Sequence, residues 1–159
     1  MEPLLPEGLA RVNRLLCQDI PDDRFVTAFF GVLKPERHEL EFISAGHGPV
    51  LVIRSGSGTI EQLPIQGLPL GVAPDLSYAR WERTHFDPGD VMIALTDGFA
   101  ECEDQRGNAF GIDRIAEILA GRHRLSAVEL IEELYRELLV HAQGSGQSDD
   151  LTAVVIRKT

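Results

Sequence analysis

Two acidic turns at the ends of apolar segments are the residues best suited to chemistry in this chain. Apolar residues 91–94 run into the turn 95–98, which contains Asp97, and the turn 147–150, which contains Asp149, runs into apolar residues 151–156. If these segments are neighbouring strands of one sheet, Asp97 and Asp149 meet at one edge of it. Carboxylate oxygens are the ligands that Mg²⁺ and Mn²⁺ prefer. An oxygen-ligated metal in a cleft suggests hydrolysis at phosphorus.

The elements that must position these turns are a run of short strands followed by two helices. Helices are predicted over 5–18, from Ile112 to near Gly121, and from a capping box at Ser126 and Glu129 to near Gly144. Strands are predicted over 24–33, 39–42, 50–54, 59–63, 78–86, 91–96 and 151–156. This order predicts an α+β fold with a mainly antiparallel sheet, not a doubly wound one.

Burial can also be predicted for two of these strands. The segment 24–33 is β-branched and aromatic, which favours a buried strand. In the next strand Leu40 and Phe42 alternate with Glu39 and Glu41, which predicts one wet face. The Pro-Gly pair at 88–89 predicts a turn before Asp90.

Composition limits the classes of protein that are possible. A chain of 159 residues, 43% of them hydrophobic, can form one well-packed domain. Its net charge of -10 argues against binding a nucleic-acid backbone. Two cysteines without ligand spacing favour a reducing cytoplasm, and no apolar run reaches the roughly 18 residues of a membrane span.

An ordered set of motifs resembles the SpoIIE-like branch of the metal-dependent type 2C protein Ser/Thr phosphatases. Each motif is weak alone, but they follow the family's order from about residue 9 to the end. The matching stretches are Phe25-Val26-Thr27-Ala28-Phe29, Ala45-Gly46-His47-Gly48-Pro49, Gly67-Leu68-Pro69-Leu70-Gly71-Val72, Pro88-Gly89-Asp90, Thr96-Asp97-Gly98, Phe110-Gly111 and Gln147-Ser148-Asp149-Asp150-Leu151-Thr152.

The resemblance implies an α-β-β-α sandwich with a two-metal Mn²⁺/Mg²⁺ site at one end of paired sheets. By this resemblance Asp97 and Asp149 are metal ligands and catalytic residues, and Asp150 supports the site from the next position. A metal-activated water would attack phosphoserine or phosphothreonine. The substrates implied are small STAS-type anti-anti-sigma proteins of bacterial partner switching.

One departure from the family pattern affects these expectations. The family begins with strands that carry another aspartate, which bridges both metals, and this chain starts in what resembles the following helix. We therefore expect residues 1–159 to form a single but incomplete phosphatase domain with weak metal binding. Lost strands would also expose the edge at 24–33, which makes a homodimer plausible.

Blander interpretations exist for each motif. An Asp-Gly pair after a strand is a common turn, and His47 between two strands suits a turn or hydrogen-bond anchor as well as a catalyst. The loop 67–71 lacks a Walker lysine and predicts a structural connection. Cys102 has no nearby His and is not expected to be a nucleophile. The alternative function is an inactive interaction module of the same fold.

Overall fold

The structure is a computed structural model that describes residues 5–21, 23–78, 81–144 and 149–159. The chain divides into two compact units, one of Met1–His47 with Pro64–His85 and one of Gly48–Leu63 with Phe86–Thr159. Each unit contains one sheet, and all strand pairs are antiparallel. The predicted α+β class with antiparallel sheets is therefore confirmed.

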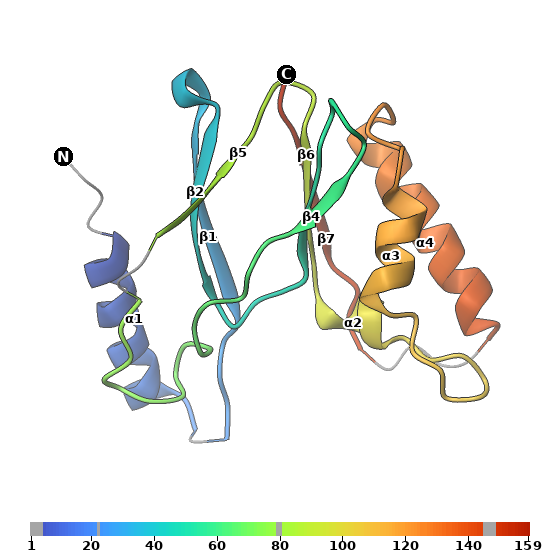
Figure 1. Cartoon of the computed structure of the whole chain (residues 1–159). Helices are drawn as coiled ribbons and strands as arrows, with labels where there is room; N and C mark the ends of the chain where they lie inside the picture. The colour runs from blue at the N-terminus through green and yellow to red at the C-terminus, as the bar shows by residue number, and fades with distance from the viewer. Residues whose placement is uncertain (1–4, 22, 79–80, 145–148) are drawn as a thin grey trace. The chain divides into compact units, whose positions relative to one another are not determined.

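The first unit holds a three-stranded sheet in the order β1-β2-β5. Its strands are β1 (Ala28–Lys34), β2 (Glu39–Ala45) and β5 (Glu82–His85), with the short 3-10 helix η1 (Pro35–Arg37) between β1 and β2. Helix α1 (Leu5–Asp19) belongs to the same unit (Figure 1). Leu9 of α1 and Ile43 of β2 join one buried cluster, so the helix packs on this sheet.

Helix α1 matches the prediction for 5–18, but the residues that it buries are not all apolar. Val12 is 44% exposed, whereas Asn13 is fully buried. The Asn13 amide donates to the carbonyl of Ala73 at 2.7 Å and accepts from the N–H of Gly71 at 2.9 Å. Asn13 thus connects the helix to the loop after Gly67 through both the N–H and the oxygen of its side-chain amide.

The two burial predictions in this unit were wrong. Strand β1 begins at Ala28 instead of residue 24, and Phe25 is 60% exposed, because β1 lies at one end of the sheet order. Strand β2 has no wet face, because it lies between two strands and Glu41 is buried against Lys34 and Arg83. The hydrogen-bonded Lys34 ammonium holds the pKa of the Glu41 carboxyl below its usual range.

The second unit holds a four-stranded sheet in the order β4-β3-β6-β7. Its strands are β4 (Ile60–Gln62), β3 (Val50–Ile53), β6 (Val91–Leu95) and β7 (Ala153–Arg157). Its helices are α2 (Asp97–Glu101), α3 (Ile112–Leu119) and α4 (Ala127–Ala142).

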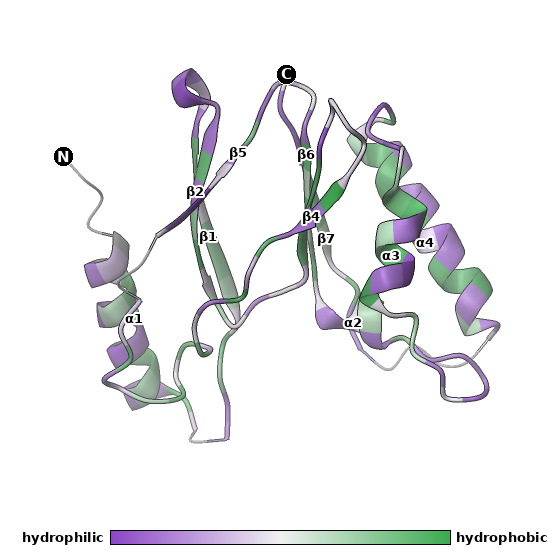
Figure 2. Cartoon of the chain, in the orientation of Figure 1, coloured by the Kyte–Doolittle hydropathy of each residue, from purple (hydrophilic) through white to green (hydrophobic). Residues whose placement is uncertain are grey.

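Helices α3 and α4 lie against one face of this sheet (Figure 1). Figure 2 shows that both helices carry apolar as well as polar residues, as expected for a helix that buries one face and exposes the other. The buried cluster contains Leu51, Ile53, Val91, Ile93, Leu95, Phe99, Phe110, Ile115, Ile118, Leu119, Leu130, Leu134 and Leu138. No helix in the described ranges is long and apolar enough to cross a membrane.

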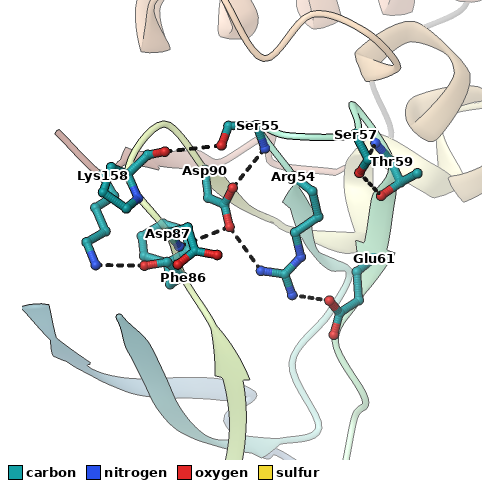
Figure 3. Close-up of polar contacts among 10 residues, drawn as sticks. Arg54, Ser55, Ser57, Thr59, Glu61, Phe86, Asp87, Asp90 and Lys158 are labelled. Carbon is teal, nitrogen blue, oxygen red and sulfur yellow. Dashed lines mark hydrogen bonds and ion pairs between the residues drawn. The ribbon is translucent and has the colours of Figure 1, made fainter. Parts of the chain in front are cut away.

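Asp90 explains the Pro-Gly-Asp motif that precedes β6. Its buried carboxylate accepts from the backbone N–H of Ser55 at 2.8 Å, the N–H of Asp87 at 3.1 Å and the Arg54 guanidinium at 3.1 Å. Arg54 also pairs with Glu61 of β4 (Figure 3). The motif therefore ties the turn before β6 to the β3–β4 hairpin, at the end of β6 remote from Asp97.

Candidate active site

The two acidic segments lie side by side at one end of the second sheet. Strands β6 and β7 pair antiparallel with Leu95 opposite Ala153, so the end of β6 meets the start of β7. Thr96 joins the segments, because its N–H donates to the carbonyl of Thr152 at 3.0 Å and its hydroxyl donates to the carbonyl of Asp150 at 3.0 Å. The N–H of Thr152 donates in turn to the Thr96 hydroxyl at 2.9 Å.

Asp97 is the first residue of helix α2, not part of a simple turn as the sequence predicted. Its Oδ1 accepts from the N–H of Gly98 at 3.0 Å, which fixes the carboxylate near the helix start. Gly98 is required by packing, because a Cβ at this position would lie 2.7 Å from the carbonyl oxygen of Asp150. Any larger residue would force the two acidic segments apart.

Asp149 and Asp150 are exposed and precede β7. Asp149 Oδ1 accepts from the N–H of Asp150 at 2.7 Å, and the Asp150 carbonyl is the group that receives Thr96. Gln147 and Ser148 of the same motif lie outside the described residues. The backbone around Asp149 is therefore held by Thr96, whose role is not evident from its place in the Thr-Asp-Gly motif.

The donors at this end of the sheet suit a hard divalent cation in kind. Asp97 and Asp149 offer carboxylate oxygens from adjacent segments, and oxygen is what Mg²⁺ and Mn²⁺ prefer. Over the ranges that the structure describes, however, no group of three His, Cys, Asp or Glu side chains is placed to hold a metal. The carboxylate oxygens are thus the right kind of ligand for Mg²⁺ or Mn²⁺, but they are too few. Water or residues beyond those described would have to complete the coordination shell.

His47 and Cys102 lie in structural surroundings. The Thr27 hydroxyl and His47 Nδ1 are 3.3 Å apart, and the Ser44 hydroxyl donates to the His47 carbonyl at 2.8 Å. His47 is therefore a hydrogen-bonded member of the turn after β2. Cys102 is half-buried and packs against the apolar cluster of the second unit.

The loop 67–71 is a structural connection, as the sequence predicted. The N–H of Gly67 donates to the Ser44 carbonyl at 3.0 Å, and Leu70 exchanges two hydrogen bonds of 2.8 Å with Val26. Gly46, at a φ of 71°, lies so close to Pro69 that an added Cβ would stand 2.7 Å from its ring. Two of the quoted motifs are thus in direct contact with each other.

Comparison with known proteins identifies relatives along the whole chain. The family model of Stage II sporulation protein E (SpoIIE) matches residues 2–159. The phosphoserine phosphatase RsbU of Bacillus subtilis (strain 168) is 28% identical over 150 residues, which are 94% of this chain and 44% of RsbU. The chain spans less than half the length of the curated relatives it matches.

Solved structures share the fold. The SiaA-PP2C domain of Pseudomonas aeruginosa matches with a TM-score of 0.73 at 21% identity, over 98% of this chain and 70% of that domain. The PP2C phosphatase domain of SpoIIE from Bacillus subtilis, solved with a fragment of its regulatory domain, matches with a TM-score of 0.75 at 18% identity, over 96% of this chain and 43% of that one. The fold is PP2C-like, and because the family model covers nearly every residue, this chain belongs to the SpoIIE family of PP2C-type protein phosphatase domains.

Proposed function

We propose that residues 1–159 act as one metal-dependent Ser/Thr phosphatase domain with Asp97 and Asp149 as metal ligands. The observation that carries the proposal is the set of hydrogen bonds through which Thr96 holds the two acidic segments together. Membership of a metal-dependent phosphatase family gives this arrangement its chemical meaning. Asp150 supports the site through its backbone carbonyl, which receives the Thr96 hydroxyl.

The chain's own residues orient the metal ligands. The Gly98 N–H bound to Asp97 Oδ1 and the Asp150 N–H bound to Asp149 Oδ1 each restrict the rotation of one carboxylate. Gly98 permits the close approach of the segments. When bound, Mn²⁺ or Mg²⁺ would lower the pKa of a water and stabilise negative charge on a phosphoryl group, so no covalent nucleophile is needed.

The proposed substrate is a phosphoserine or phosphothreonine protein. RsbU is named a phosphoserine phosphatase and matches 94% of this chain, which supports the same reaction here. The family resemblance points further, to a phosphorylated STAS-type anti-anti-sigma protein. The charge of -10 argues against a nucleic-acid substrate.

Metal affinity tests the ligand assignment directly. Two carboxylates hold Mg²⁺-type ions weakly, because such ions keep their waters unless several ligands compete. We expect weak Mn²⁺ binding and little turnover by the 159-residue chain, and tighter binding and faster turnover in a longer chain in which the opening strands of a SpoIIE-type relative precede these residues. Isothermal titration with MnCl₂ and release of phosphate from a phosphoserine protein measure the two properties.

Substitution in the longer chain separates ligands from other acids. Asp97→Asn and Asp149→Asn should each weaken Mn²⁺ binding and lower turnover by about 100-fold or more, since each removes a charged ligand. Asp113→Asn, which removes an acid from the first turn of α3, is the matched control and should change neither. Full Mn²⁺ affinity in the Asp97→Asn variant would refute the assignment.

A second candidate is an inactive interaction module of the same fold. It is favoured by one observation, that the described residues supply fewer than three metal-binding side chains in any one place. Binding of the phosphoprotein without turnover by the longer chain, with Mn²⁺ present, would favour the module.

A further inference from the structure

A polar cavity of about 500 Å³ lies in the second unit, away from the residues of the proposed active site. It is formed by the loop after α2, the first turn of α3 and the end of α4. Its lining residues are Asp104, Gln105, Arg106, Arg114, Val140, His141 and Gln143. The volume is within the usual range of small-ligand sites.

Arg114 is held in place by two aromatic rings. Its guanidinium carbon lies 5.1 Å from the centre of the Phe110 ring, and its Nη1 lies 3.1 Å from His141 Nδ1. The rings of Phe110 and His141 meet edge to face, with centres 5.2 Å apart. A guanidinium has five N–H donors, and only one has a partner among the described residues. The guanidinium group of Arg114 is therefore held in one orientation, and most of its N–H groups are available to bind a ligand.

The two contacts of His141 fit the tautomer that carries its proton on Nε2. A guanidinium can only donate, so His141 Nδ1 accepts from Arg114. Nε2 lies 2.9 Å from the carbonyl oxygen of Asn108, which can only accept, so Nε2 donates. In this arrangement His141 positions Arg114.

The carboxylate of Asp104, which lines the cavity, accepts hydrogen bonds from residues of its own loop. Asp104 accepts from the backbone N–H groups of Arg106 at 2.8 Å and Asn108 at 2.9 Å, and from the Asn108 amide at 2.9 Å. These hydrogen bonds, led by those from Asn108, hold the pKa of Asp104 at about 2. Asp104 therefore shapes the loop and forms no ion pair with either arginine among the described residues.

The arginines of the cavity differ from three others of the second unit, although Arg124 and Arg157 also form no ion pair with an acid among the described residues. Arg54, Arg122 and Arg136 each pair with at least one carboxylate. Neither Arg114 nor Arg106 has such a partner in the described part of the chain, although acids outnumber Lys and Arg by 25 to 15. Two guanidinium groups at one cavity, on a protein rich in acids, indicate a place for an external anion.

We propose that this cavity binds a phosphoryl group. Arg114, whose guanidinium group is held in a fixed orientation, is the main hydrogen-bond donor, and Arg106 is the second donor. Guanidinium groups match the geometry of oxyanions and bind them through paired hydrogen bonds. A dianionic phosphoryl group has enough oxygen atoms to accept hydrogen bonds from both arginines. A carboxylate has two oxygen atoms and pairs with one guanidinium group. The group can belong to free phosphate or to a phosphorylated side chain. The proposal does not depend on the phosphatase activity.

The test uses the 159-residue chain with EDTA, so that no divalent cation can bind the anion elsewhere. Heteronuclear NMR follows titration with inorganic phosphate, a phosphoserine peptide and the same peptide without phosphate. We expect saturable shifts of the Gln105 and Gln143 side-chain amides with the first two probes and none with the third. Tighter binding of the peptide than of free phosphate would identify a phosphorylated side chain as the source, and the reverse order a free anion.

Variants locate the binding to the cavity. Arg114→Gln should weaken binding of the better probe by about tenfold or more, the usual effect of losing a charge-assisted bidentate contact. Arg106→Gln, at an exposed position where folding is not at risk, should weaken it a few-fold. Arg136→Gln on α4 is the matched control for loss of charge and should bind as the unchanged chain does.

Two results would overturn the proposal. One is the absence of saturable shifts with both phosphorylated probes. The other is unchanged affinity in the Arg106→Gln and Arg114→Gln variants, with the Arg114→Gln chain shown by its NMR spectrum to be folded.

Discussion

Asp90 is a buried charged residue that supports the second sheet. Burial raises the pKa of Asp90, but the N–H groups of Ser55 and Asp87 and the Arg54 guanidinium outweigh that effect and hold the pKa below its usual range. The ionised carboxylate therefore stabilises the turn that leads into β6. Because β6 leads through Thr96 to Asp97, this turn helps to set the strand that precedes the proposed metal ligand.

Removing the Asp90 carboxylate should destabilise the chain strongly. Asp90→Ala leaves two backbone N–H groups without their acceptor and leaves Arg54 with Glu61 alone, and each buried donor without a partner costs about 1–3 kcal/mol. The free energy of unfolding by urea measures the effect. Glu61→Gln is the control: Glu61 is 46% exposed, so its pair with Arg54 should contribute about 1 kcal/mol or less. Equal losses in the two variants would contradict a special role for Asp90.

The same carboxylate predicts a response to acid. A lowered folded-state pKa adds stability that is complete above the unfolded value, about 3.9, and is lost as the pH falls through the folded value. As the pH falls below about 4, the unfolding free energy of the unchanged chain should therefore decrease more steeply than that of Asp90→Asn. Urea titrations at several pH values give both slopes, and parallel slopes would show that Asp90 does not contribute.

At the scale of elements, α4 combines a secured start with an exposed apolar stripe. The predicted capping box is present: the N–H of Glu129 donates to the Ser126 hydroxyl at 3.2 Å, and the N–H of Ser126 donates to the Glu129 carboxylate at 2.7 Å. The buried face of the helix is Leu130, Leu134 and Leu138. Its outer face carries the exposed side chains Val128, Ile131, Tyr135 and Leu139.

Loss of the cap should weaken α4. Ser126→Ala removes the acceptor for the Glu129 N–H, and such substitutions cost about 1 kcal/mol. Thermal unfolding followed by circular dichroism should show a lower midpoint. Ser57→Ala, at an exposed loop serine, should shift the midpoint much less. A helix unaffected by Ser126→Ala would mean that packing of its three buried leucines alone determines its start.

At the scale of the whole molecule, β1 is an end strand with exposed apolar side chains that could support association. It lies at one end of the order β1-β2-β5, with Val32 37% and Leu33 41% exposed. The other end strand, β5, carries the charged residues Glu82 and Arg83, which discourage pairing with another chain. Self-association through β1 remains a prediction that the sequence suggested and the strand order supports.

We expect the chain to form dimers that dissociate on dilution. Light scattering across a concentration series gives the mass directly. Val32→Lys places a charge on the exposed edge and should shift the series towards monomer. Val128→Lys adds the same charge to the outer face of α4 and is the control. A mass of one chain at every concentration would count against an available edge.

Short-range patterns predicted most of the strands and helices, but not helix α2 or the start of β1. They predicted the meeting of Asp97 with the segment of Asp149 only on the condition that β6 and β7 are neighbours, because three helices separate these strands in the sequence. Apolar runs of strand length, separated by Gly and Pro turns, determine where strands form, and strands that follow one another by short turns pair antiparallel. An acid after one strand and an acid before its antiparallel neighbour then share one end of the sheet. For the same reason the capping box at Ser126 could be predicted.

Only the tertiary structure decided which polar side chains are buried and which apolar ones are not. Glu41 is covered because ion pairs from β1 and β5 reach it, and Asn13 is covered because the loop at 71–74 closes over α1. Arg114 meets His141 across 27 positions of sequence. Periodicity reports the face on which a residue lies, but the groups that meet that face come from distant parts of the chain, so their pairing depends on the fold.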